Sequence, residues 1–95
     1  MKELERILKE FVEKGRLTDT VEETLADIKE LNDRSFEEIK KENIEDKTEE
    51  FKRLRFTIKN NISGCALVQF ARENNYLTLD NTKQIAEEIA KEYLK

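Results

Sequence analysis

The stretch FKRLRFTIKNNISGCALVQFAR, residues 51–72, decides the fold because its residues fit either a helix or a pair of strands. As a helix, it places one set of apolar side chains on the same face: Phe51, Leu54, Ile58 and Ile62. As strands, residues 54–59 alternate apolar and polar side chains, and Asn60-Asn61 forms the turn. We favour the helix, since it continues an apolar face that begins at Phe36.

The composition of the whole chain also favours helices. Its 95 residues include no proline and two glycines, and they are rich in Glu, Lys, Leu and Ile. These side chains lose little freedom in a helix. We therefore predict an all-α fold in which a single domain, residues 1–95, forms a compact antiparallel bundle of four to five helices. The alternative is an α+β fold with a small sheet formed by strands near 53–59, 65–71 and 76–79.

Apolar spacing before residue 51 predicts a helical hairpin at the start of the chain. The first helix covers 2–14 and ends at Gly15, where glycine adopts the left-handed conformation without steric cost. Residues 19–23 contain two overlapping capping boxes, so the second helix starts there. The short connection predicts that the second helix packs back on the first.

The third helix is less regular. Asn32-Asp33-Arg34 interrupts the apolar pattern, and Ser35 with Glu38 forms a further capping box, so we predict a helix end and a new start there. Between residues 40 and 50 the only large apolar residue is Ile44. We expect the third helix to fray or bend in that interval.

The last third of the chain predicts two more helices. Ser63 is a suitable N-cap for a fourth helix that is apolar on nearly all sides, so we expect this helix to be the central, most buried element. Cys65 is then a small buried hydrophobe. Asn74-Asn75 ends this helix, and a fifth covers about 81–94.

Several groups needed for common enzyme chemistry are missing. The chain has no histidine, so it lacks the usual general base and the commonest metal ligand. A lone cysteine cannot form the usual zinc site, and the two glycines are too far apart for a phosphate loop. We expect neither an enzyme nor a bound cofactor or metal. The alternative is a carboxylate-based Mg²⁺-dependent nucleotide hydrolase using acids within 22–30 and 37–45, although interleaved lysines favour a solvated face.

Charge is distributed unevenly along the chain. Residues 1–50 contain 17 acids and 10 bases, a net charge of −7, whereas residues 51–95 contain 5 acids and 8 bases, a net charge of +3. The acidic half is expected to repel nucleic acid. Any binding surface for an acidic partner should therefore lie in the second half.

The candidate binding residues lie at the start of the deciding stretch. They are Lys52, Arg53, Arg55, Phe56 and Lys59. In a helix, Phe56 projects away from the apolar face, with Lys52 one turn before it and Lys59 one turn after it. The alternative is that Phe56 is buried against another helix and that the bases pair with the acidic half.

These observations predict a small intracellular interaction or regulatory protein, such as an inhibitor or a phage- or plasmid-borne regulator, that acts by surface binding. Its partner is expected to be a protein with an acidic surface. The alternative is a nucleic-acid-binding protein that uses residues 52–59. The single cysteine, the acidic N-terminus and the absence of a long uncharged run indicate a cytoplasmic protein without membrane contact. The long apolar face from Phe36 to Ile62 suits a homodimer as well as a monomer core.

Overall fold

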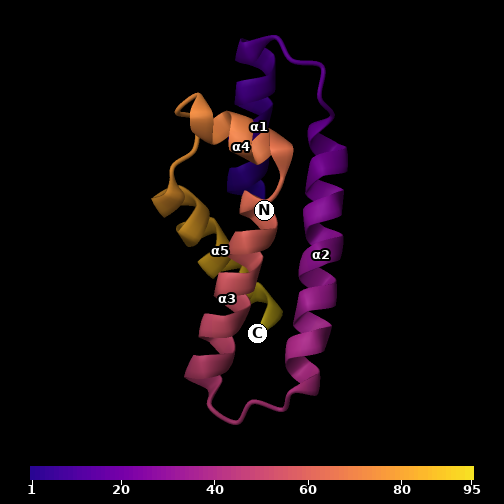
Figure 1. The fold of residues 1–95 in the computed structure, drawn as a ribbon, viewed down its shortest axis with the longest axis vertical. Helices are drawn as coiled ribbons and strands as arrows, with labels where there is room; N and C mark the ends of the chain where they lie inside the picture. The colour runs from indigo at the N-terminus through magenta and orange to yellow at the C-terminus, as the bar shows by residue number, and fades with distance from the viewer.

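The computed structural model describes residues 1–95 as five helices without a strand (Figure 1). The helices are α1 (Lys2–Gly15), α2 (Val21–Lys41), α3 (Lys47–Ser63), α4 (Ala66–Glu73) and α5 (Leu79–Tyr93). The all-α prediction is confirmed, and the alternative sheet within 53–79 is wrong. The alternation over 54–59 is incidental, because the residues of that segment that become fully buried, Leu54 and Ile58, are one helical turn apart.

The molecule is elongated, measuring 47 × 23 × 20 Å, and α1, α2 and α3 run along its long axis (Figure 1). α1 and α2 form the predicted antiparallel hairpin, and α2 and α3 form a second, longer one (Figure 1). α4 crosses the end of α3 beside α1, and α5 returns along α3 (Figure 1). The result is a bundle that joins helices distant in the sequence, since α3 packs against α5 and α1 against α4.

The central helix is α3, which packs against α2, α4 and α5. Its Leu54, Ile58 and Ile62 have no exposed surface. The prediction that the fourth helix is the most buried element is wrong. α4 is short and lies at one end of the bundle, and its Phe70 is 51% exposed. Apolar composition therefore did not identify the centre, because burial depends on how many other helices a helix contacts.

α2 is one continuous helix, and the predicted break at Asn32-Asp33-Arg34 is wrong. Asn32 is 1% exposed, and its side-chain oxygen accepts a hydrogen bond from Asn61 Nδ2 of α3 at 3.0 Å. Asp33 accepts one from Lys29 Nζ at 2.9 Å, one turn earlier on α2. In the sequence these polar residues resemble a loop. In the structure Asp33 has its partner on α2 and Asn32 has its partner on α3.

The chain instead turns between Lys41 and Lys47, inside the interval predicted to fray or bend. Asn43 there has a positive φ of 52°. The side chain of Asp46 then caps α3 by accepting hydrogen bonds from the backbone N–H of Thr48 and Glu49. The capping box predicted at Ser35 and Glu38 is wrong, since both residues lie within α2.

The turn between α1 and α2 also differs from its prediction. Arg16, with φ 55°, is the left-handed residue, whereas Gly15 is the last residue of α1. Thr20 occupies the N-cap position of α2, but no side-chain capping bond forms, so the capping boxes predicted over 19–23 are wrong. Thr24 Oγ1 instead donates to the Thr20 carbonyl at 3.3 Å.

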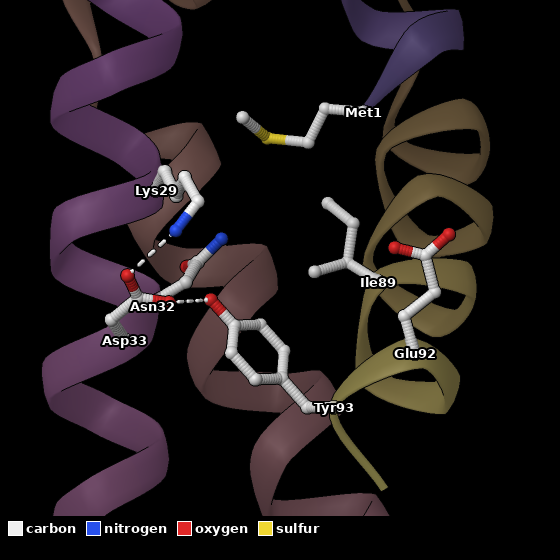
Figure 2. Close-up of a pocket in the computed structure, with 7 residues that line it drawn as sticks. All are labelled: Met1, Lys29, Asn32, Asp33, Ile89, Glu92 and Tyr93. Carbon is white, nitrogen blue, oxygen red and sulfur yellow. Dashed lines mark hydrogen bonds and ion pairs between the residues drawn. The ribbon is translucent and has the colours of Figure 1, made fainter. Parts of the chain in front are cut away.

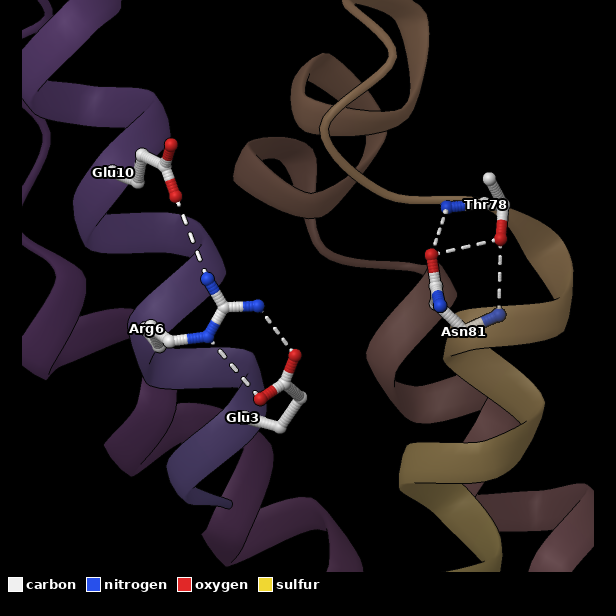
Figure 3. A network of polar contacts seen from close by, with 5 residues as sticks. All are labelled: Glu3, Arg6, Glu10, Thr78 and Asn81. Carbon is white, nitrogen blue, oxygen red and sulfur yellow. Dashed lines mark hydrogen bonds and ion pairs between the residues drawn. The ribbon is translucent and has the colours of Figure 1, made fainter.

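The boundaries of the last three helices agree in part with those predicted from the sequence. The break at Ser63-Gly64 is confirmed, but Ser63 ends α3 instead of capping α4, and its hydroxyl is buried without a hydrogen-bond partner. Asn74-Asn75 ends α4, and Asn75 has a φ of 66°. α5 begins two residues before the predicted start because Thr78 and Asn81 form a capping box, shown in Figure 3.

The outer surface of the bundle carries short-range ion pairs. Figure 3 also shows Arg6 of α1 between Glu3 and Glu10, at 2.6 and 3.5 Å. Such exposed pairs within one helix contribute little to stability. None of the five helices is long and apolar enough to cross a bilayer.

Candidate functional site

Phe56 is the most exposed of the large apolar side chains, at 59% of its surface. It lies on α3, whose opposite face supplies the fully buried Leu54 and Ile58. Lys59 Nζ lies 4.7 Å from the centre of the Phe56 ring. The ring therefore already contacts one cation, and the remainder of its surface is open to a partner.

A shallow groove runs beside Phe56, between α3 and α5. Arg55, Phe56 and Lys59 line it from α3, and Lys83, Gln84 and Glu87 line it from α5. Its volume is about 330 Å³. We call this the α3–α5 groove. It combines one exposed aromatic ring with three cations, and its single acid, Glu87, already lies 3.7 Å from Lys91.

The cations of the groove have no acidic partner within the molecule. Arg55, Lys59 and Lys83 form no ion pair within 4.0 Å. Lys52 is also exposed and unpaired, and it lies one turn before Phe56 on the same side of α3. Arg55 does contact an aromatic ring, that of Phe51, at 5.7 Å. We call Lys52, Arg55, Phe56, Lys59 and Lys83 the basic surface.

Arg53 is separated from the other predicted binding residues. Its guanidinium pairs with Glu42 near the end of α2, with Nη1 2.6 Å from Oε2 and Nη2 3.1 Å from Oε1. This two-bond geometry directs Arg53 toward α2 instead of α5. The acidic half of the chain thus neutralises one residue of the basic stretch. The structure brings together four of the five predicted residues, and their binding role stays a prediction.

Lys83 was missed by sequence reasoning. It lies 24 positions after Lys59, and only the packing of α5 against α3 brings it to the groove. The net positive charge of residues 51–95 is the one signal that pointed to further cations. That signal does not distinguish Lys83 from Lys91 or Lys95.

Other exposed apolar residues lack this combination of features. Phe70 is 51% exposed, but it does not line the groove. Leu31, on α2, is 45% exposed. Cys65 is half-buried and packs against the core, so it is less buried than predicted. Phe56 is therefore the exposed apolar residue that the structure places among unpaired cations.

The acidic residues of α2 are dispersed along its surface. Nowhere do three or more acidic or thiol side chains come close enough to hold one metal ion. Glu22 Oε1 lies 3.9 Å from Lys9 Nζ, and Glu30 Oε1 lies 2.5 Å from Arg34 Nη2. The acids considered for Mg²⁺ therefore include residues that pair with cations on the helix surfaces.

A second polar cluster joins the end of α5 to the middle of α2. The Tyr93 hydroxyl and Lys29 Nζ both donate to Asp33, one to each carboxylate oxygen. These two hydrogen bonds lower the pKa of Asp33 from its usual value. Partial burial, followed by the bond to Asp33, raises the pKa of Tyr93. At neutral pH the cluster holds an ionised Asp33 and a protonated Tyr93.

Comparison with family models, with curated proteins and with solved structures found no match to this chain.

Proposed function

We propose that this chain is a small interaction protein that binds an acidic surface of another protein through its basic surface. The observation that carries the proposal is the exposed Phe56 ring in a groove whose cations have no acidic partner. Aromatic and arginine side chains are frequent hot spots of protein interfaces. Unpaired cations would speed association with an acidic partner and select against basic ones.

The position of this surface supports binding without a large ordering cost. Phe56 and its neighbours lie on α3, and the opposite face of that helix is fully buried in the core. The backbone of the basic surface is therefore already ordered before a partner binds. Pre-ordered residues lose less entropy on association than residues of a loop.

Such a protein would act by occupying a surface of its partner, as inhibitors, adaptors and phage- or plasmid-borne regulators do. We place it inside the cell, in the cytoplasm, on the basis of its single free cysteine, which suits a reducing compartment. Catalysis is not part of this proposal.

The test compares four baits in affinity capture from a cell lysate. They are the wild type, Phe56→Ala, the double variant Lys59→Glu/Lys83→Glu and the control Lys41→Glu/Lys95→Glu. The control makes the same change in charge at exposed lysines that form no ion pair. We expect the wild type and the control to capture the same acidic protein, and the other two baits to lose it. Equal recovery by all four baits would show that the basic surface is not the binding surface.

A second copy of the chain is another source of acidic surface, since residues 1–50 carry a net charge of −7. Sedimentation of the purified protein over a concentration series separates this case from a different partner. Self-association that Lys59→Glu/Lys83→Glu abolishes would identify the homodimer as the complex.

Single-stranded nucleic acid is the second candidate ligand, because the open Phe56 ring lies beside cations suited to phosphates. The net charge of −4 opposes it. Titration of labelled single-stranded DNA and RNA at increasing salt tests it. Saturable binding that weakens steeply with salt and is lost in Phe56→Ala supports this candidate, and no binding at low salt removes it.

A further inference from the structure

A cleft separate from the basic surface lies between α2 and α5, beside the start of α1 (Figure 2). Its walls are formed by Met1 at the start of α1, by Lys29, Asn32 and Asp33 of α2, and by Ile89, Glu92 and Tyr93 of α5. Its volume is about 400 Å³, within the range of small-molecule sites. We call it the α2–α5 cleft, and Figure 2 shows its lining.

Asn32 presents an unused hydrogen-bond donor to this cleft. The residue is 1% exposed, and its Oδ1 accepts from Asn61 Nδ2 at 3.0 Å. That bond orients the amide so that Nδ2 points toward the space beside Lys29 and Met1, as Figure 2 shows. Asn32 Nδ2 itself donates to no atom of the protein. The one buried side-chain polar atom without a partner is Ser63 Oγ, so Asn32 Nδ2 retains contact with solvent and can donate to an acceptor that enters the cleft.

The charges around Asn32 define what that acceptor should be. Lys29 Nζ uses one of its hydrogens on Asp33, which leaves donors for a second anion. The Tyr93 hydroxyl occupies the other oxygen of Asp33, so this carboxylate has a donor on each oxygen. Two donors, Asn32 Nδ2 and Lys29 Nζ, therefore remain available on the α2 side, where a carboxylate would use both.

The α5 side has the opposite character. Lys29 and Asp33 compensate each other's charge, whereas Glu92 forms no ion pair within 4.0 Å with a lysine, an arginine or the amino terminus. A simple carboxylate would be repelled by Glu92, whereas a molecule that also carries an ammonium group would not. Met1 and Ile89 supply apolar contact surface between these polar sides (Figure 2).

We propose that the α2–α5 cleft binds a free α-amino acid with an apolar side chain. Its carboxylate accepts hydrogen bonds from Asn32 Nδ2 and Lys29 Nζ. Its ammonium group pairs with Glu92, and its side chain contacts Met1 and Ile89. The cleft shares no residue with the basic surface, so this site does not depend on the function proposed above.

The test follows ¹H–¹⁵N spectra of the full chain during titration with L-leucine and L-phenylalanine. We expect saturable shifts of the Asn32 side-chain amide and of the backbone amides of Lys29 and Glu92. L-Leucinamide, which lacks the carboxylate, and N-acetyl-L-leucine, which lacks the ammonium group, should each bind about tenfold more weakly or worse, as expected for losing one charged hydrogen bond. Leucinamide binding as tightly as leucine would overturn the assignment.

Two variants and a control test whether leucine binds in the cleft. Lys29→Gln changes an exposed side chain and should weaken leucine binding about tenfold. Lys41→Gln, at an exposed lysine on the same helix without an ion pair, is the matched control and should bind as the wild type does. Asn32→Asp keeps an oxygen for Asn61 and should abolish binding by removing the donor. The proposal is overturned if the wild type shows no saturable shift at millimolar leucine and phenylalanine, or if the shifts map away from the cleft.

Discussion

The α3–α5 groove and the α2–α5 cleft both use α5, but their charged groups are arranged in opposite ways. In the groove, Arg55, Lys59 and Lys83 have no acidic partner. In the cleft, Lys29, Asp33 and Tyr93 satisfy one another, and one buried amide is left with a free donor. Charges without an ion-pair partner leave their attraction available to a large partner. The hydrogen bond from Tyr93 to Asp33 joins α5 to α2 and contributes to the fold itself, so changes in the two regions should have different consequences.

The largest expected effect comes from the core beneath both regions. Ile58 of α3 has no exposed surface, and Ile58→Ala should lower the free energy of unfolding by about 2 to 5 kcal/mol. Urea denaturation monitored by circular dichroism measures this change. Ile58→Val is the control and should cost about 1 kcal/mol. Similar stability of Ile58→Ala and the wild type would mean that α3 is not the central helix.

Phe56→Ala should separate binding from stability. The exposed ring is expected to contribute on the order of 2 kcal/mol to a protein complex, so its loss should weaken binding about 30-fold. The free energy of unfolding should change by no more than about 0.5 kcal/mol. Calorimetric titration of the captured partner and urea denaturation provide the two measurements. A variant that loses stability but keeps its affinity would reverse the roles assigned to the two faces of α3.

Tyr93→Phe should show the opposite behaviour, with stability reduced and partner binding unchanged. The hydroxyl donates to Asp33 across the cleft, and its loss should cost about 1 kcal/mol at neutral pH. The pKa of Asp33 is lowered in the folded chain, first by Tyr93 and then by Lys29. This stabilisation is complete above the unfolded pKa of about 3.9 and is lost as the pH falls through the folded pKa.

Urea denaturation of the wild type and Tyr93→Phe over an acidic pH series measures how this stabilisation changes with pH. The difference in unfolding free energy should be largest at neutral pH and should shrink on acidification. A difference that grows as the pH falls would exclude a hydrogen bond to an ionised Asp33.

The smallest effect is expected for Arg53, which was predicted as a binding residue but pairs with Glu42. Both side chains are nearly half exposed, so Arg53→Gln should cost about 0.5 kcal/mol or less of stability. Partner affinity should remain within about twofold, whereas Lys59→Gln should reduce it several-fold. Calorimetric titrations of the two variants make the comparison. Equal losses of affinity would place Arg53 within the binding surface.

Residues near one another in the sequence were predicted best. The outward position of Phe56 follows from 100° of rotation per residue along α3, since Leu54 and Ile58 must face the core. The full lining of the groove could not be predicted from α3 alone, because Lys83 comes from α5. The cleft could not be predicted from the sequence. One of its lining residues, Asn32, is a buried polar residue whose hydrogen-bond partner, Asn61, lies 29 positions later in the chain.

Helix boundaries were likewise predicted where they depend on nearby residues and missed where they depend on distant ones. Polar residues at 32–34 resemble a loop because local patterns do not reveal whether a distant partner will satisfy them. The end of α4 at Asn74-Asn75 was recognisable, because the preference of asparagine for the left-handed conformation acts locally and Asn75 adopts it. Gly64 also marks the end of α3, although its φ of −77° is right-handed.

The amino-acid sequence by itself determined that the chain is helical and that Phe56 projects away from the apolar face of α3, with Lys52 and Lys59 one turn from it. Both properties follow from side-chain spacing and intrinsic preference along a single helix. Only the tertiary structure decided that α3 is central, that Arg53 pairs with Glu42, that Lys83 joins the groove and that Asn32 presents a free donor to a cleft. These features depend on which helices pack together, since packing determines both the burial of a side chain and the partners within its reach.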